Sequence, residues 1–338
     1  MPELFQTVYG RGLIPELKTF VNRPYLVVTM DDLWPRFADD FDDGLAGPLL
    51  VRTLDRADLE RIVAELPAFE SIIGLGGGQA LDVAKYVAWK RRRPLFQVPT
   101  AMSVNAAFGH RAAVRVDGVV RYVAFAVPEA VYVDFDVIRA APLILNRSGV
   151  GDILCYHTAH WDWKMAADLG KVEARWPYDP RLVAEARVAL DRVVEAADEI
   201  HAVTDDGIRA LMESLRWGGA AFHNAGWNPR HIEGADHFVF YNLEYLTGKH
   251  FIHGQPVCLG VLLMSALQEN EAERMKDVCD RIGVPYHPEE MGVTWEDLEE
   301  ALRTLPGFVE KAGLWYTVAS ERPITEEYIA RMREWLTA

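Results

Sequence analysis

Three residues that lie far apart in the sequence have side chains suited to binding a divalent metal. Asp152 stands in Gly-Val-Gly-Asp-Ile-Leu, His237 in Gly-Ala-Asp-His, and His253 in Phe-Ile-His-Gly-Gln-Pro-Val. One carboxylate and two imidazoles can hold such an ion and leave a fourth position open for water or substrate. Their spacing is not that of a known zinc motif, so the hypothesis depends on the residue types.

A second feature is a glycine turn between an apolar run and a segment with helical spacing. The run at 72–75 leads into Gly76-Gly77-Gly78, and Asp82 follows in the first part of the expected helix. Glycines let a backbone approach a ligand closely and adopt positive φ, and a helix N-terminus favours a phosphate. The spacing differs from the Gly-x-Gly-x-x-Gly fingerprint. Together with the metal set, the turn indicates a metal-dependent enzyme that binds a nucleotide.

Length and composition are those of an ordinary soluble enzyme. The chain has 338 residues, half of them apolar, and a net charge of −15, which argues against nucleic acid as a partner. The first 22 residues lack the pattern of a secretion signal, and no apolar run is long enough for a membrane helix. Three widely spaced cysteines fit a reducing compartment. We therefore expect a cytoplasmic protein with no membrane partner.

The elements that must position these residues change in type along the chain. Expected strands are 25–30, 48–52, 71–75, 94–98 and 130–134, with a hairpin formed by 113–116 and 122–127 around Asp117-Gly118. Helices expected among them are 56–66 and 81–89. Strands alternating with helices predict a mostly parallel sheet with crossover connections.

After about residue 140 the pattern is helical throughout. Amphipathic segments cover 153–167, 180–201, 205–217 and 257–282, and Thr294 and Thr325 stand at helix-start signatures. The sequence thus predicts an α/β dinucleotide-binding domain over 1–142 and an all-helical metal- and substrate-binding domain over 143–338. Ligand sites commonly form between two such domains.

Several motifs occur in the order in which they stand in one enzyme family. They are Gly-Gly-Gly-x-x-x-Asp-x-x-Lys (76–85), Pro-Thr-Ala-Met-Ser (99–103), Val-Asp (133–134), Gly-Asp-Ile-Leu-x-x-x-Thr-Ala-x-x-Asp-Trp-Lys (151–164), Gly-Ala-Asp-His (234–237) and His-Gly-x-x-Val (253–257). The chain resembles the glycerol-1-phosphate dehydrogenases, within the superfamily of iron-containing alcohol dehydrogenases, glycerol dehydrogenase and dehydroquinate synthase. The resemblance covers roughly residues 20–265, and the 151–164 stretch is its most specific part.

This resemblance implies a dehydroquinate synthase-like fold and a role for each matched residue. It implies that the metal ligands are Asp152, His237 and His253. It implies that the cofactor contacts are Gly76, Gly77, Gly78, Asp82, Thr100 and Ser103, the last two beside the nicotinamide and its phosphates. The cofactor would be NAD or NADP. Zinc is the metal that this ligand set, borderline between hard and soft donors, favours. Iron or nickel could also bind to the same ligands.

The chain departs from the family pattern at three places. Asn105 replaces an aspartate that contacts the substrate hydroxyl or relays its proton, and an amide cannot exchange a proton near neutral pH. Tyr241 replaces a second histidine, and its ordinary pKa near 10 makes it a poor base. Arg230 lies in a scrambled substrate-phosphate stretch, where it could still bind a phosphate. Asn105 and Tyr241 are the candidate catalytic residues, and Asn105 and Arg230 the candidate substrate contacts.

These observations predict a metal-dependent, NAD(P)-linked oxidoreductase. It would reduce a small ketone resembling dihydroxyacetone phosphate, or oxidise the corresponding secondary alcohol or polyol, and we expect a homo-oligomer. One alternative is a dehydroquinate synthase-like sugar-phosphate cyclase, against which Asp152 argues because such enzymes carry a glutamate at the first ligand. The other is a degenerate member that only binds nucleotide, which Asn105 and Tyr241 would explain. The charged residues Arg52, Asp55 and Arg56 leave NAD and NADP open.

Overall fold

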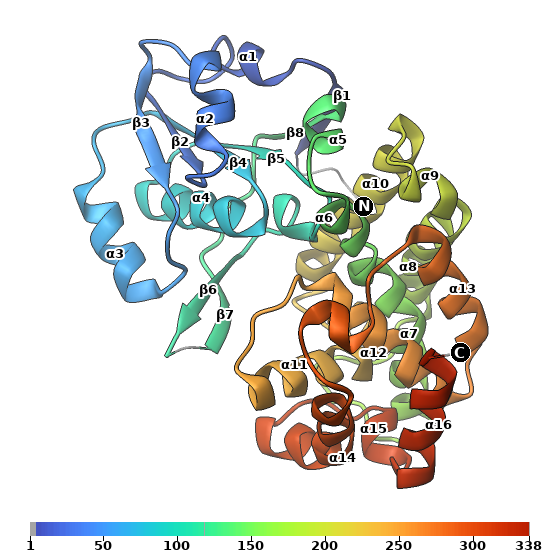
Figure 1. The fold of residues 1–338 in the computed structure, drawn as a ribbon. Helices are drawn as coiled ribbons and strands as arrows, with labels where there is room; N and C mark the ends of the chain where they lie inside the picture. The colour runs from blue at the N-terminus through green and yellow to red at the C-terminus, as the bar shows by residue number, and fades with distance from the viewer. Residues whose placement is uncertain (1–4, 118, 338) are drawn as a thin grey trace. The chain divides into compact units, whose positions relative to one another are not determined.

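The computed structural model describes residues 5–117 and 119–337, which form two compact units. The first unit runs to Asn146 and includes Gly219–His223, and the second contains Arg147–Gly218 and the residues from Asn224 onward. Figure 1 shows both units with their elements labelled. The division into domains 1–142 and 143–338 stays a prediction.

The first unit is an α/β structure. Its elements are β1 (Gln6–Gly10), α1 (Ile14–Leu17), β2 (Tyr25–Thr29), α2 (Trp34–Phe37), η1 (Ala38–Asp40), β3 (Leu45–Leu50), α3 (Arg56–Glu65), β4 (Ser71–Gly76), α4 (Gly78–Arg91), β5 (Leu95–Pro99), η2 (Asn105–Ala107), β6 (Ala112–Val116), β7 (Val119–Val123), β8 (Ala130–Asp134) and α5 (Phe135–Arg139), with α6 (Leu143–Ser148) at its boundary.

Six strands form a sheet in the order β1-β8-β5-β4-β2-β3, and all neighbouring pairs are parallel. The prediction of a mostly parallel α/β region is therefore confirmed. β6 and β7 form the predicted antiparallel hairpin, although β7 begins at Val119 rather than at Tyr122. Gly118, part of the predicted turn, lies outside the described residues. β1 was not predicted, because this partly exposed edge strand has no continuous apolar run.

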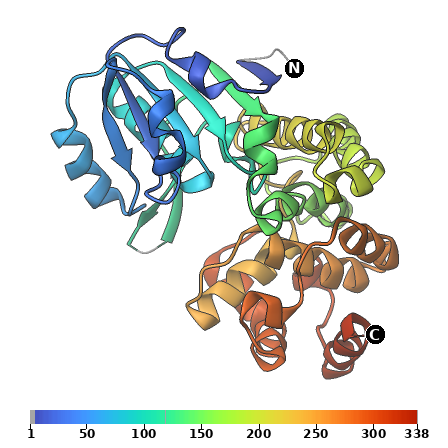
Figure 2. The same cartoon turned by 45° about the horizontal axis from the view of Figure 1, so that its top comes forward.

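Both faces of the sheet are apolar and buried, because alternating residues of the central strands belong to two different core clusters. Val27 and Ile73 belong to a core cluster that includes residues of α1, whereas Leu26 and Ile72 belong to one that includes residues of α3 and α4. Successive strand side chains point to opposite faces of a sheet, so a strand buried on both sides is apolar throughout. Figure 2 shows the strands running side by side within this unit. Because neighbouring strands are parallel, their carboxyl ends lie along the same edge of the sheet.

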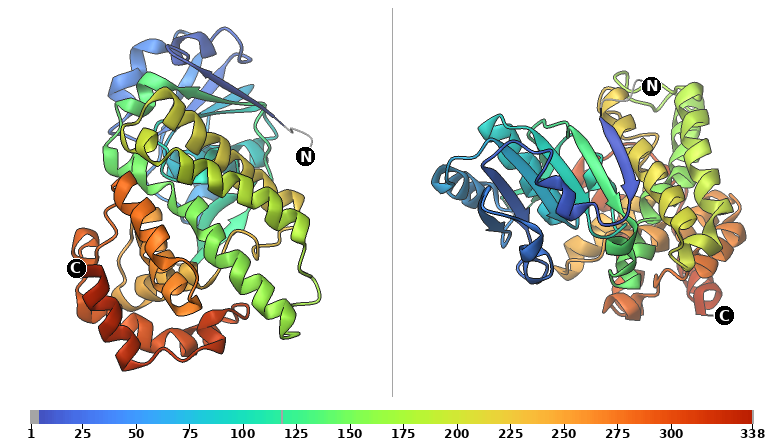
Figure 3. Two further views of the ribbon diagram at one scale, coloured as in Figure 1. Left: turned by 90° about the vertical axis from the view of Figure 1, so that its right-hand side faces the viewer. Right: turned by 90° about the horizontal axis from the view of Figure 1, so that it is seen from above.

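Every described element of the second unit is a helix. The elements are α7 (Gly151–Asp168), α8 (Pro180–Glu195), α9 (Ala197–His201), α10 (Asp205–Asn224, whose Gly219–His223 belong to the first unit), α11 (Ala235–Thr247), α12 (Gly254–Gln268), α13 (Ala272–Ile282), η3 (Pro288–Met291), α14 (Trp295–Ala312), α15 (Val318–Glu321) and α16 (Glu326–Thr337). Figure 3 shows the long helices of this unit from two further sides. The prediction of an all-helical second half is confirmed.

Two predicted helical segments are each divided in the structure. The segment 257–282 breaks between α12 and α13, where Glu269 and Glu271 have φ values of 57° and 45°. The segment 180–201 breaks at Ala196, between α8 and α9. Apolar periodicity continues across both breaks, so it does not mark them. Among the described residues, no helix is long and apolar enough to cross a membrane.

Candidate metal centre and cofactor-binding turn

Asp152, His237 and His253 come together in the second unit. Each offers one ligand atom, and these three atoms all lie within 4.8 Å of one another. His253 Nε2 is 2.9 Å from Asp152 Oδ1. The side chains of Asp152 and His237 are 8% and 5% exposed, whereas that of His253 is 28% exposed. The cluster is thus buried on one side and accessible on the other.

All three residues stand at the beginning of a helix. Asp152 is in the first turn of α7, His237 is the third residue of α11, and His253 is the N-cap of α12. Side chains in the first turn of a helix extend toward its N-terminal end. Convergence of three helix starts therefore explains how residues so distant in sequence meet.

Glycines beside the ligands allow these helices to approach closely. A Cβ on Gly151 would lie 2.7 Å from the Gly254 backbone. The starts of α7 and α12, which carry Asp152 and His253, are therefore in contact. A Cβ on Gly260 of α12 would lie 2.3 Å from the carbonyl oxygen of Asp236 in α11. Real side chains do not tolerate such distances. The glycines therefore let the ligand-bearing helices come close enough for Asp152, His237 and His253 to meet.

The electrostatic environment of the cluster favours a cation. Burial lowers the pKa of His237, but the hydrogen bond to Asp236 and the charges of Asp236, Glu233 and Asp152 outweigh it and raise that pKa to about 9. The Nδ1 of His237 lies 3.3 Å from Asp236 Oδ2, an arrangement that orients a ligating imidazole. Without a metal, the site attracts a proton instead. A divalent cation must displace that proton, so its binding weakens as the pH falls below about 9.

Tyr241 lies beside the ligand cluster. Its ring centre is 5.9 Å from that of His237, one helical turn earlier on α11, and its hydroxyl donates to Glu233 Oε2 over 3.2 Å. Burial raises the pKa of Glu233, while the nearby His237 and His253 act to lower it. Tyr241 and Glu233 thus form a hydrogen-bonded pair next to the two histidines.

These residues fit a bound metal ion. One carboxylate and two imidazoles have the donor atoms that zinc and similar ions accept, and three protein ligands leave one coordination position open. The hydrogen bond from His237 to Asp236 supplies the outer partner that metal-bound histidines usually have. Donor type, spacing and outer partner therefore all suit a divalent cation.

The glycine turn lies at the carboxyl end of β4 in the first unit. Gly76 ends the strand with φ of 155°, whereas Gly77 is the N-cap of α4 with φ of −81°, so positive φ is required at Gly76 and not at Gly77. A Cβ on Gly77 would meet nothing within 4 Å. The N-cap of α4 thus has open space beside it, and the N–H groups in the first turn of a helix, which lack partners within the helix, suit a phosphate.

Strand order places this turn at the point where chain connections change direction. From β2 the chain continues to β3 on one side, and β4 lies on the other side of β2. Leu33, in the segment after β2, would lie 3.5 Å from a Cβ on Gly76. Ligands of open parallel sheets bind outside the carboxyl ends of strands at such a point. The geometry therefore fits a dinucleotide in contact with Gly76, Gly77 and Gly78.

The other predicted cofactor residues after β5 lie next to the turn. The Thr100 N–H donates to the Gly76 carbonyl over 3.0 Å, and a Cβ on Gly78 would lie 2.9 Å from Val104. Ser103 stands just before Val104, and Asn105 begins the short helix η2. The structure thus gathers Thr100, Ser103 and Asn105 near the glycines at one edge of the sheet.

Asp82, one of the predicted cofactor contacts, is buried and bonded to a neighbouring residue of the protein. Its carboxylate lies 2.7 Å from Lys85 Nζ, and the Lys85 ammonium also donates to the Arg111 carbonyl over 2.6 Å. Burial raises the pKa of Asp82, and Lys85 and the Ala113 N–H lower it. These bonds hold α4 against the start of the hairpin. The predicted role of Asp82 in cofactor binding stays a prediction, and its bonds point to positioning of α4.

Arg230 also differs from its expected setting. Its side chain is 1% exposed, with Nη1 donating to the Tyr316 carbonyl over 2.6 Å and Nε 3.6 Å from Glu173. Burial lowers the pKa of Arg230, which the charge of Glu173 partly offsets. The buried Nε and Nη2 of Arg230 have no hydrogen-bond partner among the described residues. The substrate contact predicted for Arg230 stays a prediction, and in the structure its side chain is buried against protein groups.

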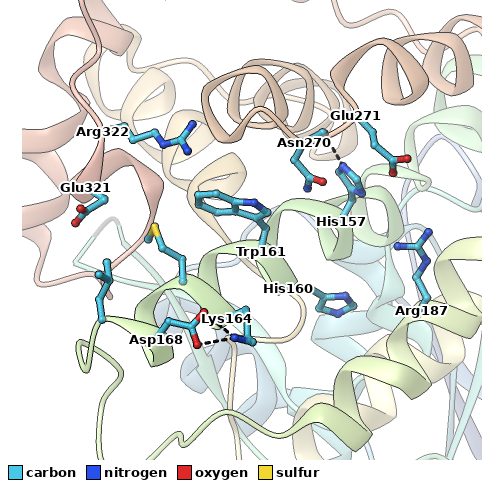
Figure 4. Close-up of a pocket in the computed structure, with 12 residues that line it drawn as sticks. His157, His160, Trp161, Lys164, Asp168, Arg187, Asn270, Glu271, Glu321 and Arg322 are labelled. Atoms are coloured by element: carbon cyan, nitrogen blue, oxygen red, sulfur yellow. Dashed lines mark hydrogen bonds and ion pairs between the residues drawn. The ribbon is translucent and has the colours of Figure 1, made fainter.

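A pocket of about 690 Å³ lies elsewhere in the second unit and contains none of the predicted site residues. Figure 4 shows it between α7, α8 and the segments at Asn270 and Arg322. Its charged groups are bonded to protein neighbours, as Lys164 is to Asp168 and Arg322 to Glu269. Volume alone therefore does not make this pocket a site for the predicted chemistry.

Sequence reasoning assigned no role to Glu233 or to the ligand-flanking glycines. Glu233 precedes α11, so helical spacing does not place it beside His237. Gly151 and Gly254 adjoin ligands in the sequence, and that adjacency was the available signal for their close packing. The carboxylate of Asp236, which precedes His237 in the sequence, contacts that histidine and accepts the Gly234 N–H.

Both a family model and individual proteins of known name match the sequence of this chain. Residues 42–142 match the family model described as iron-containing alcohol dehydrogenase. A glycerol-1-phosphate dehydrogenase (NAD(P)+) of Staphylothermus marinus is 32% identical over 261 residues, which are 77% of this chain and 71% of that one. The enzyme of the same name from Hyperthermus butylicus is 26% identical over 338 residues, covering 96% of this chain and 95% of that one.

Solved structures share the fold. A probable glycerol dehydrogenase from Sinorhizobium meliloti superposes with a TM-score of 0.74 at 20% identity, covering 99% of this chain and 98% of that one. At this identity the likeness concerns the fold alone. The predicted combination of a parallel α/β region and a helical remainder, as in the dehydroquinate synthase-like fold, is confirmed.

Proposed function

The chain belongs to the glycerol-1-phosphate dehydrogenase family, and we propose that it is a metal-dependent, NAD(P)-linked oxidoreductase. It reduces a small ketone of the dihydroxyacetone phosphate type, or oxidises the corresponding secondary alcohol or polyol. The observation that carries this proposal is the meeting of Asp152, His237 and His253 ligand atoms within 4.8 Å.

Asp152, His237 and His253 would hold the metal, and zinc is our choice because the donor set is borderline. When bound, the ion supplies a Lewis acid that polarises a carbonyl oxygen or stabilises the corresponding alkoxide. Asp236 keeps the His237 ring oriented through Nδ1. His253, the most exposed of the three, lies on the side from which a substrate oxygen can approach.

Gly76, Gly77 and Gly78 would hold the pyrophosphate of NAD or NADP at the start of α4, with Thr100 and Ser103 beside the nicotinamide end. When bound, the cofactor supplies the transferable hydride at nicotinamide C4. The choice between NAD and NADP stays open. Arg52 and Asp31 form an ion pair over 3.7 Å, and the side chain of Asp55 caps the N-terminus of α3.

Reduction of a ketone also needs a proton at the new hydroxyl oxygen. We assign Asn105 to hold that oxygen by a hydrogen bond, since its amide cannot deliver a proton near neutral pH. The Tyr241 hydroxyl, bonded to Glu233, is a group of this chain that can exchange one. This pair supports an active enzyme rather than a degenerate nucleotide-binding protein. The free, buried cysteines and the composition support a cytoplasmic setting, and a homo-oligomer stays a prediction.

Replacing Asn105 by aspartate tests the substrate. If the substrate is dihydroxyacetone phosphate, Asn105→Asp should raise its reduction by roughly 10- to 100-fold, because a carboxylate can relay the alcohol proton. Steady-state kinetics of parent and variant on dihydroxyacetone phosphate, glycerol and unphosphorylated polyols measure the effect. Asn22→Asp, which adds the same charge at an exposed position of the first unit, serves as the control. Loss of activity on every substrate that the parent uses would exclude the simple glycerol phosphate assignment.

A further inference from the structure

Asp162 is a buried carboxylate of α7 that lies outside the ligand cluster. It belongs to the Asp-Trp-Lys end of the 151–164 stretch, and only 1% of it is exposed. A buried ionised carboxyl group is costly unless donors surround it. The groups that donate hydrogen bonds to Asp162 therefore indicate its structural role.

Three N–H donors from three other elements meet this carboxylate. Oδ2 accepts the backbone N–H of Ala235 over 2.8 Å, and Oδ1 accepts the backbone N–H of Val318 over 2.8 Å. Oδ1 also accepts Nε2 of Gln268 over 3.0 Å, and the same Nε2 donates to the Thr158 carbonyl of α7 over 3.0 Å. Both carboxylate oxygens are thus in use.

Two of these three donors belong to the helices that carry the other metal ligands, whereas Val318 is the first residue of α15. Ala235 is the first residue of α11, which presents His237 one half-turn later. Gln268 is the last residue of α12, whose N-cap is His253. Asp162 itself is on α7, the helix of Asp152. A single side chain therefore bonds all three ligand-bearing helices to one another.

The start of α11 is also packed directly against Asp162. A Cβ on Gly234 would lie 2.8 Å from Asp162 Oδ2 and 2.9 Å from the Ala159 backbone. The N-terminus of α11 thus has no room to shift toward α7, and its first N–H group is capped by a residue of the other helix. The position of His237 follows from that of the helix start.

We propose that Asp162 is a positioning residue for the metal centre, bonding α7 to the start of α11 and to the end of α12 so that Asp152, His237 and His253 keep their spacing. This inference rests on the proposed function, because it presumes that the cluster binds a metal. Asp162 touches none of the three ligands and acts only through the helices.

Asp162→Asn tests the proposal with little change in side-chain volume. The remaining oxygen can still accept from Val318 and Gln268, whereas the new amide would direct an N–H against the Ala235 N–H and displace the start of α11. Titration of the metal-free protein with Co²⁺, followed by its visible absorption, reports both affinity and ligand geometry. We expect affinity to fall by roughly 10- to 100-fold, as for other outer partners of metal ligands, and the absorption band to change.

The titration is performed at pH 8. Burial raises the pKa of Asp162 to about 7, which the N–H groups of Ala235 and Val318 and the Gln268 amide oppose. Above that pH the parent carboxylate is ionised and both oxygens accept hydrogen bonds.

Ser214→Ala is the matched control. Ser214 is fully buried and donates to the Ala189 carbonyl over 2.9 Å, so it joins α10 to α8 and no ligand-bearing helix. Its loss should lower the melting temperature through a missing buried hydrogen bond. Affinity for Co²⁺ and the absorption band should stay as in the parent, which separates positioning from general stability.

Gln268→Leu provides an independent test, and decides the matter if Asp162→Asn does not fold. It removes the link from α12 to Asp162 while leaving the carboxylate and the start of α11 intact, and we expect a smaller loss of Co²⁺ affinity with the same spectral change. Parental affinity and spectrum in the folded variants would overturn the positioning role. A parent that binds no Co²⁺ would instead contradict the proposed function.

Discussion

Asp152→Asn and His253→Ala are each expected to remove the divalent metal and abolish turnover while leaving the chain folded. Asp152→Asn keeps the shape of the side chain but loses the only carboxylate of the ligand set, and His253→Ala removes the most accessible donor. Lewis-acid stabilisation is worth several kcal/mol, and each ~1.4 kcal/mol is tenfold in rate. We therefore expect kcat to fall at least ~1,000-fold. Elemental analysis of the dialysed proteins measures the metal.

Controls of the same residue types lie close by. Asp168→Asn changes an exposed carboxylate at the end of the same helix, and His250→Ala removes an exposed histidine shortly before His253. Both should keep metal and activity. Circular dichroism of all four variants checks the fold. Parental metal content in Asp152→Asn and His253→Ala would show that the ligand assignment is wrong.

Gly77→Val is expected to block dinucleotide binding without unfolding the first unit. Gly77 has an ordinary φ of −81°, and a Cβ there meets nothing within 4 Å, so valine can be accommodated by the protein alone. Its methyl groups would occupy the space that a pyrophosphate needs at the start of α4. Loss of two hydrogen bonds to a charged phosphate, at roughly 1.5–3 kcal/mol each, weakens binding by at least ~100-fold.

Calorimetric titration with NADH and with NADPH measures the effect of Gly77→Val. Gly307→Val is the control, because Gly307 in α14 also has open space around an added Cβ and lies in the second unit. That variant should bind both cofactors as the parent does. Unchanged affinity of Gly77→Val for both NADH and NADPH would place the cofactor elsewhere.

Much of the fold follows from local patterns. The strand β4 and its glycine turn were predictable because a fully buried parallel strand is apolar throughout and ends where glycine permits positive φ, as Gly76 does. Helical periodicity gave the long helices of the second unit. The edge strand β1 and the break at Glu269 have no comparable local signal, since the first is half-exposed and the second interrupts a continuous apolar pattern.

The site was predictable in its residue types but not in its geometry. Asp152, His237 and His253 were selected by chemistry and by resemblance, whereas their convergence depends on backbone contacts such as that between Gly151 and Gly254. Such contacts join segments a hundred residues apart, which periodicity cannot report. The burial of Arg230 has the same origin, because its partners Glu173 and Tyr316 are also distant in sequence.

The most direct measurement is turnover of dihydroxyacetone phosphate by the parent protein before and after metal removal. Absorbance at the reduced-nicotinamide band follows NADH and NADPH consumption in the purified, chelator-treated and Zn²⁺-reconstituted protein. We predict consumption with at least one cofactor, its loss on chelation, and its return with Zn²⁺. Consumption that persists in protein shown by elemental analysis to be free of metal would contradict the account, as would no turnover of any ketone or polyol by the fully loaded protein.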